Sequence, residues 1–185
     1  MRLALSPVVK ALALAVTLLA AGLVAQTASA EKYASIVIDA DTHEVLHARN
    51  ADEARYPASL TKVMTLYMLF DALKAGEVSL DERLVVSRHA ASQPPSNLKL
   101  RTGSTISVRD AIGALVSKSA NDVAVVVAER LGRSESRFAQ LMTVKAKSLG
   151  MHNTRFRNAS GLPDTQQMST ARDLAILADA MLTDH

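Results

Sequence analysis

The stretch Pro57-Ala58-Ser59-Leu60-Thr61-Lys62 opens a helical pattern and places a serine and a lysine three residues apart. Apolar side chains recur with a helical period from Ser59 to Lys74, and Gly76 stands where such a helix ends. Residues three apart share one helical face, so the Ser59 hydroxyl and the Lys62 amine come within hydrogen-bond reach if the helix begins at or just before Ser59. The sequence therefore predicts a largely buried helix with both groups on its first turn.

This pair of side chains is suited to nucleophilic catalysis. A serine hydroxyl keeps its proton at neutral pH, so it attacks a carbonyl carbon only beside a neutral base. Burial and the positive end of the helix dipole are expected to lower the pKa of Lys62 and to favour the neutral amine. The alternative is that Ser59 only caps the helix and Lys62 is solvated, and the spacing alone does not decide between the two.

A second polar segment, Lys118-Ser119-Ala120-Asn121-Asp122, separates two apolar helical patterns at 108–116 and 123–131. On a tight connection, Ser119 and Asn121 can point into one cleft, where a hydroxyl relays a proton and an amide holds a substrate group. The alternative is a helix junction capped by Asn121. Ser-x-x-Lys followed by Ser-x-Asn is the pattern of serine enzymes that recognise penicillin.

The first thirty residues have the composition of an export signal. They carry Arg2 and Lys10, no acidic residue, and a small-residue ending, Ala28-Ser29-Ala30. Their apolar run, about fifteen residues, is shorter than the roughly twenty that a spanning helix needs. We expect residues 1–30 to be a cleaved signal peptide and the protein to be secreted to the periplasm or cell envelope. An uncleaved membrane anchor is the alternative.

Composition excludes several other classes of site. The chain has no cysteine, so it forms no disulfide and no thiolate site. Its five histidines are scattered without metal-ligand spacing, and we expect no metal and no cofactor. Aromatic residues make up 3% of the chain and no long basic run occurs, so no nucleic-acid partner is expected.

The remaining pattern is that of an α+β chain, with strands first and helices after. Residues 34–39 and 44–49 flank a turn and predict a β-hairpin, and Val85-Val86 predicts a short strand. A long loop is expected at 93–97, and turn formers fill residues 158–164. Three further helix starts are predicted by small hydroxyl residues: Ser107, Ser134 and Thr170.

The chain resembles the low-molecular-mass penicillin-binding proteins, the serine-type D-alanyl-D-alanine carboxypeptidases. The resemblance covers nearly all of residues 34–180 and rests on these stretches: Ser-Leu-Thr-Lys-Val-Met-Thr at 59–65, Ser-Ala-Asn-Asp at 119–122, Leu-Gly-Met-His-Asn-Thr-Arg-Phe at 149–156, Asn-Ala-Ser-Gly-Leu at 158–162 and Ser-Thr-Ala-Arg-Asp at 169–173. It implies a β-lactamase/transpeptidase-like fold, with helices packed on an antiparallel sheet. It also implies that Ser59 is the acylated nucleophile and Lys62 the proton acceptor. Ser119 would relay a proton and Asn121 would bind the substrate backbone, with peptidoglycan stem peptides as substrates and β-lactams as ligands.

The family's third motif, Lys-Thr-Gly on a strand that lines the opposite wall of the cleft, does not follow these stretches. Arg101-Thr102-Gly103 imitates it, but this triplet precedes Ser119 and reads as a turn leading to Ser107. We therefore expect residues 31–185 to be an incomplete transpeptidase-like catalytic domain, truncated before its C-terminal strands and the family's usual C-terminal membrane anchor. The missing strand would supply one oxyanion donor, whose loss costs about a hundred- to a thousand-fold in rate, so residues 31–185 are not expected to be competent alone.

Three alternatives accompany this interpretation. A class A β-lactamase needs a water-activating Glu-x-x-x-Asn, but Glu129 and Glu135 lead to Arg133 and Ala139, so slow deacylation of penicillin is expected. A D,D-endopeptidase would use the same residues as a carboxypeptidase, and the sequence does not separate the two. A truncated, non-catalytic envelope protein is the third alternative.

Overall fold

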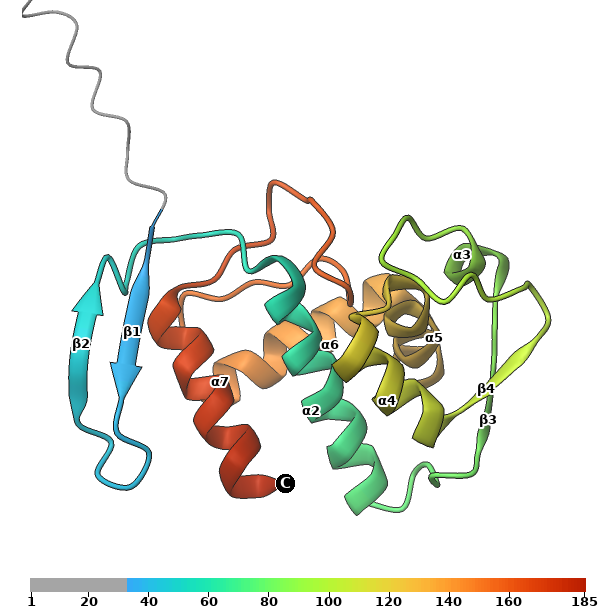
Figure 1. The fold of residues 1–185 in the computed structure, drawn as a ribbon, viewed down its shortest axis with the longest axis horizontal. Coiled ribbons are helices and arrows are strands. Elements are labelled where there is room, and N and C mark those ends of the chain that lie inside the picture. Colours follow the sequence, from blue (N-terminus) through green and yellow to red (C-terminus); the bar gives the residue numbers. More distant parts are fainter. Residues whose placement is uncertain (1–32) are drawn as a thin grey trace, which may run out of the picture. The chain divides into compact units, whose positions relative to one another are not determined.

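The structure, a computed structural model, describes residues 33–185, and the predicted signal peptide lies outside the described residues. In this part of the chain, helices surround a buried centre and two small antiparallel sheets lie beside them (Figure 1). The elements are β1 (Ser35–Ile38), β2 (Val45–Arg49), the 3₁₀ helix η1 (Ala58–Leu60), α2 (Thr61–Lys74), β3 (Arg83–Val85), α3 (Arg88–Ala91), β4 (Thr105–Ser107), α4 (Val108–Lys118), α5 (Asn121–Gly132), α6 (Glu135–Ser148) and α7 (Ala171–Asp184). The predicted α+β class is confirmed.

The predicted N-terminal hairpin is present. Strand β1 pairs antiparallel with β2, with Val37 opposite His47. The Asp39 carboxylate closes the turn by accepting the N–H groups of Thr42 at 2.8 Å and Asp41 at 3.0 Å. These bonds, the one from Thr42 first, favour the charged carboxylate and lower the pKa of Asp39. The turn residues therefore fix the hairpin register locally, and β1 packs against α7.

Helix α2 follows η1 without a break and forms much of the core, as the sequence predicts. Met64, Tyr67 and Leu69 on this helix are 2% exposed or less. The helix ends at Lys74, and Gly76 adopts a left-handed conformation with φ +72° that terminates it. Ser59 lies in the 3₁₀ turn that precedes α2 and not in the α-helix itself.

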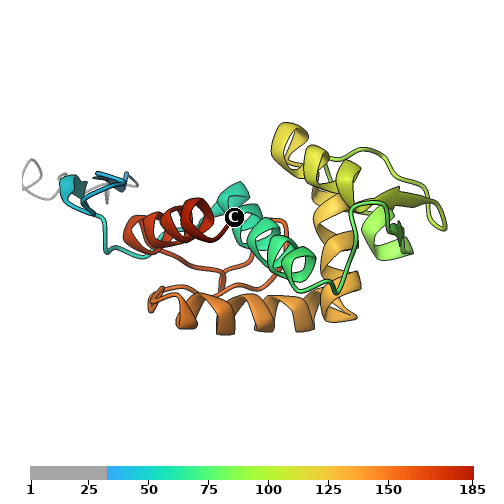
Figure 2. The ribbon, with the colours of Figure 1, turned by 90° about the horizontal axis from the view of Figure 1, so that it is seen from below.

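Helix α5 lies at the centre of the helical layer. Its residues 121–128 are all buried, and it packs against α2, α4 and α6. Figure 2 shows α6 running in a layer beneath α2 and α7. The three predicted helix starts are confirmed, because each hydroxyl accepts a backbone N–H three residues later: Ser107 from Asp110, Ser134 from Arg137 and Thr170 from Asp173.

The strand predicted at Val85-Val86 is correct only in part. Strand β3 ends at Val85 and pairs with β4, a strand that the sequence pattern does not predict. Residues 101–104 form the turn before β4, where Gly103 has φ +80° and its N–H donates to the Val86 carbonyl at 2.8 Å. The interpretation of the Arg-Thr-Gly triplet as a turn is therefore confirmed. Among residues 33–185, no helix combines the length and apolarity needed to cross a bilayer.

Candidate active site

Ser59 is exposed at the point where the chain enters α2. Ala58, directly before it, adopts a left-handed conformation with φ +47°, which a residue with a Cβ rarely occupies. Within residues 33–185, the Ser59 hydroxyl makes no hydrogen bond. The hydroxyl is therefore accessible to a substrate and is not engaged as a helix cap.

Lys62, on the first turn of α2, is 3% exposed, and its Nζ donates to the Ser160 carbonyl at 2.5 Å. Burial penalises the ammonium form and lowers the pKa of Lys62 to about 8. At pH 7, about one amine in ten is then neutral, whereas an ordinary lysine has about one in several thousand. The predicted lowering of this pKa is confirmed, and the alternative of a solvated lysine is wrong.

The expected direct hydrogen bond between Lys62 and Ser59 is not formed in the structure. Nζ reaches inward to Ser160, because a buried amine needs a buried acceptor and the Ser59 hydroxyl lies in solvent. The two residues nevertheless lie three positions apart, where η1 continues into α2. The loop that accepts the amine is thus part of the candidate site.

This loop, residues 158–162, is ordered by its own side chains. Asn158 Oδ1 accepts the N–H groups of Gly161 at 2.7 Å and Ser160 at 3.3 Å, and its Nδ2 donates to the Leu162 carbonyl at 2.9 Å. Gln167 is 2% exposed and accepts the N–H of Asn158 at 3.1 Å. These bonds hold the loop so that the Ser160 carbonyl points at α2.

The loop docks against α2 at two further points. Thr65 Oγ1 donates to the Ala159 carbonyl at 2.8 Å. Gly161 has φ +86°, and a Cβ there would lie 1.8 Å from the Ala58 carbonyl oxygen, so only glycine permits this approach. No catalytic or binding role was predicted for these residues from the sequence. The run of turn formers around a glycine was the signal that could have indicated one.

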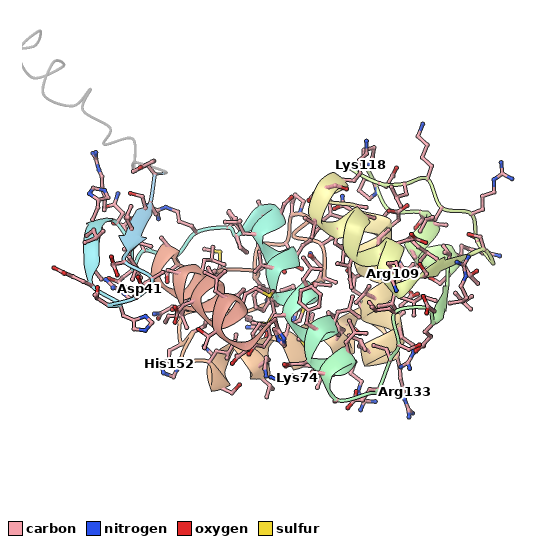
Figure 3. All side chains as sticks on the ribbon, turned by 60° about the horizontal axis from the view of Figure 1, so that its bottom comes forward. Asp41, Lys74, Arg109, Lys118, Arg133 and His152 are labelled. Atoms are coloured by element: carbon pink, nitrogen blue, oxygen red, sulfur yellow. The ribbon has the colours of Figure 1, made fainter. Side chains whose placement is uncertain are left out.

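Ser119 and Asn121 occupy the break between α4 and α5. Ser119 terminates α4 in a left-handed conformation with φ +54°, next to the exposed Lys118 at the end of that helix (Figure 3). Asn121 begins α5, donating its backbone N–H to Ser96 at 2.7 Å and its Nδ2 to Pro94 at 3.0 Å. The side chain of Asn121 therefore ties down the loop at 93–97 and does not cap the junction. Among the described residues, the Ser119 hydroxyl and the Asn121 Oδ1 have no hydrogen-bond partner.

The segments that carry the four predicted residues adjoin one another. Helix α2 packs against both α4 and α5. Figures 1 and 3 place the start of α2 and the end of α4 at the same end of the helices. Within residues 33–185, no three His, Asp or Glu side chains gather as a metal site would require. The arrangement offers an exposed hydroxyl, a buried amine of lowered pKa, a second hydroxyl and an amide oxygen.

Comparison with known proteins gives D-alanyl-D-alanine carboxypeptidases and a D-alanyl-D-alanine endopeptidase of Escherichia coli. D-alanyl-D-alanine carboxypeptidase DacF of Bacillus subtilis is 36% identical over 152 residues, which are 82% of this chain and 39% of DacF. DacC of Escherichia coli is 36% identical over 174 residues, covering 91% of this chain and 44% of DacC. The chain thus spans about two fifths of the length of these curated relatives.

Solved structures agree with this relationship. The carboxypeptidase DacD of Francisella tularensis superposes with a TM-score of 0.79 at 38% identity, covering 80% of this chain and 36% of DacD. Penicillin-binding protein D2 of Listeria monocytogenes, in its ampicillin-bound form, gives 0.68 at 34% identity, covering 82% of this chain and 62% of that protein. The predicted penicillin-binding-protein fold is therefore confirmed. The family model described as D-alanyl-D-alanine carboxypeptidase matches residues 22–185, and the chain belongs to this family.

Proposed function

We propose that the protein is a serine-type D-alanyl-D-alanine carboxypeptidase that acts on peptidoglycan stem peptides and is acylated by β-lactams. The observation that carries this proposal is the buried Lys62 amine, with a pKa of about 8, one turn after an exposed Ser59 hydroxyl. Family membership supports the reaction class, and the ampicillin-bound relative supports β-lactams as ligands.

In the proposed reaction, Ser59 Oγ attacks the carbonyl carbon of the penultimate D-alanine, and neutral Lys62 accepts the hydroxyl proton. The tetrahedral intermediate collapses as its carbon–nitrogen bond breaks. Ser119 relays this proton from Lys62 to the departing nitrogen, so D-alanine leaves with a neutral amino group and Lys62 is neutral again. Water then hydrolyses the Ser59 ester and restores the free hydroxyl. Asn121 Oδ1 is the acceptor for a substrate N–H.

Acylation by penicillin tests the proposal, because it leaves a covalent mark. Trypsin cleavage after Arg55 and Lys62 releases residues 56–62 as one peptide. We expect penicillin treatment of the purified protein to add one penicilloyl group to this peptide, with fragmentation placing it on Ser59 and not on the buried Thr61. D-alanine release from a peptide ending in D-Ala-D-Ala is not expected of residues 31–185 alone, so the penicilloyl adduct is the deciding readout. A folded protein that forms no adduct would contradict the proposal.

The rate of acylation should depend on pH through Lys62. The base acts in its neutral form, and the pKa of Lys62 is about 8, so the rate constant is low below this pH and rises to a plateau above it. We expect about a tenfold increase between pH 7 and pH 9. The measurement is the initial rate of labelling by a fluorescent penicillin across this range. A flat profile, or one that rises only toward pH 10.5, would contradict the assignment of Lys62 as the base.

We further propose that residues 1–30 export the protein to the cell envelope, where peptidoglycan lies. The charged start, apolar run and small-residue end of this segment support the proposal. N-terminal sequencing of the protein recovered from the envelope should begin at Glu31. Recovery of the intact N-terminus in the cytoplasmic fraction would contradict it.

A further inference from the structure

The loop that accepts the Lys62 amine is also held from a third side, by Glu135. This residue is the first of α6, and its Oε1 accepts the Ala159 N–H at 3.1 Å. Ala159 directly precedes Ser160, so Glu135 holds the peptide segment whose two carbonyls accept Thr65 and Lys62. Two helices far apart in the sequence, α2 and α6, therefore both bond to two consecutive residues of the loop.

The Glu135 carboxylate is itself fixed. Its side chain is 14% exposed, and its second oxygen lies 2.7 Å from Nε2 of His89, at the start of α3. Ser134 caps α6 independently, by accepting the Arg137 N–H at 3.2 Å. The helix start thus has its own cap, and the carboxylate of Glu135 is directed to the loop.

We propose that Glu135 is a positioning residue for the acyl-transfer reaction: by holding the Ala159 N–H, with His89 fixing its other oxygen, it keeps the Ser160 carbonyl in place to orient the Lys62 amine. This proposal rests on the proposed function. Hydrogen bonds to a carboxylate are stronger than those between neutral groups, so this contact anchors the loop more firmly than its neighbours. Because a displacement of about 1 Å at a reacting group can cost about a hundred-fold in rate, the anchor affects a reaction that it does not touch.

The loop held by Glu135 also excludes water from Lys62. Residues 159–160 are buried, and the Ser160 carbonyl accepts the amine of Lys62, a residue that is 3% exposed. This burial lowers the pKa of Lys62. If the anchor is removed, the loop loosens and Lys62 hydrates. The pKa of Lys62 should then rise toward the ordinary lysine value.

Three variants test the inference by two readouts, of which one needs no activity. The first readout is hydrogen exchange of the Ala159 amide, and the second is the pH profile of acylation by fluorescent penicillin. We expect Glu135→Ala to speed the exchange at least tenfold, to slow acylation at pH 7 about tenfold, and to move the profile to higher pH. Glu135→Gln keeps an acceptor oxygen for the Ala159 N–H and should restore both readouts to within about threefold of the parent.

The third variant, His89→Ala, changes an exposed side chain and should keep the fold while shifting both readouts in the same direction by a smaller amount. Glu82→Ala is the matched control, since within the described residues it removes a carboxylate that pairs with Arg130 at 2.6 Å and makes no hydrogen bond to residues 158–162. Slower acylation with unchanged Ala159 exchange overturns the inference, and so does faster exchange with an unchanged pH profile. If the parent protein is not acylated, the proposed function fails, and unchanged Ala159 exchange in both Glu135→Ala and His89→Ala would overturn the anchor on its own.

Discussion

Lys62→Met is expected to slow acylation by penicillin about a thousand-fold or more while leaving the fold intact. The substitution removes the only basic atom of the side chain and leaves an unbranched apolar chain that is one atom shorter. Lys62 is buried, so the thioether fits a site that already excludes water. The Ser59 hydroxyl then has no base to accept its proton. The measurement is the time course of labelling by a fluorescent penicillin, with circular dichroism to show that the helices persist.

Lys74→Met is the control for this experiment. It removes a lysine from the opposite, exposed end of the same helix (Figure 3). Its labelling rate should stay within about twofold of the parent, because surface charges away from a site contribute little. Equal labelling of Lys62→Met and Lys74→Met would remove Lys62 from the mechanism.

Gly161→Ala is the second substitution with a large expected effect. The new Cβ would lie 1.8 Å from the Ala58 carbonyl oxygen, so the loop or the turn before Ser59 must move. Alanine at φ +86° adds backbone strain of about 1–3 kcal/mol. We expect the free energy of unfolding to fall by about 2–4 kcal/mol and acylation to slow about a hundred-fold. Chemical denaturation and penicillin labelling measure the two effects.

Gly150→Ala is the control for this experiment, because it adds the same kind of backbone strain without a steric clash. Gly150 has φ +93°, but a Cβ there meets nothing within 4 Å. This variant should lose about 1 kcal/mol of stability and label at the parental rate. If Gly161→Ala labels as fast as Gly150→Ala, the contact between the loop and Ala58 has no part in positioning Ser59.

Features that depend on near neighbours in the chain were predictable. The hairpin turn is closed by Asp39 through bonds to residues two and three positions away. The caps at Ser107, Ser134 and Thr170 each act three residues along. Strand β4 was missed because three residues carry too little pattern, and its pairing partners on β3 lie 20 to 24 positions away.

In the candidate site, too, the features set by near neighbours in the sequence were predictable and those set by distant residues were not. The spacing of Ser59 and Lys62 indicates a shared turn, and burial of the following residues indicates a lowered pKa. The acceptor of the Lys62 amine, by contrast, is 98 residues away, at Ser160. The local spacing does not indicate that the buried amine bonds to the Ser160 carbonyl and not to the exposed Ser59 hydroxyl. The anchor at Glu135 is likewise set by the packing of α6 against α2.

The proposed mechanism depends most on the neutral Lys62 amine, and direct titration of this side chain tests it. Protein labelled with ¹³C at lysine Cε gives one signal per lysine, and the signal absent from Lys62→Met identifies Lys62. Its chemical shift, followed from pH 6 to pH 12, is expected to titrate near pH 8, below the ordinary lysine value of 10.5. A midpoint near 10.5 would show a charged, hydrated amine at neutral pH, and Lys62 could not then serve as the base.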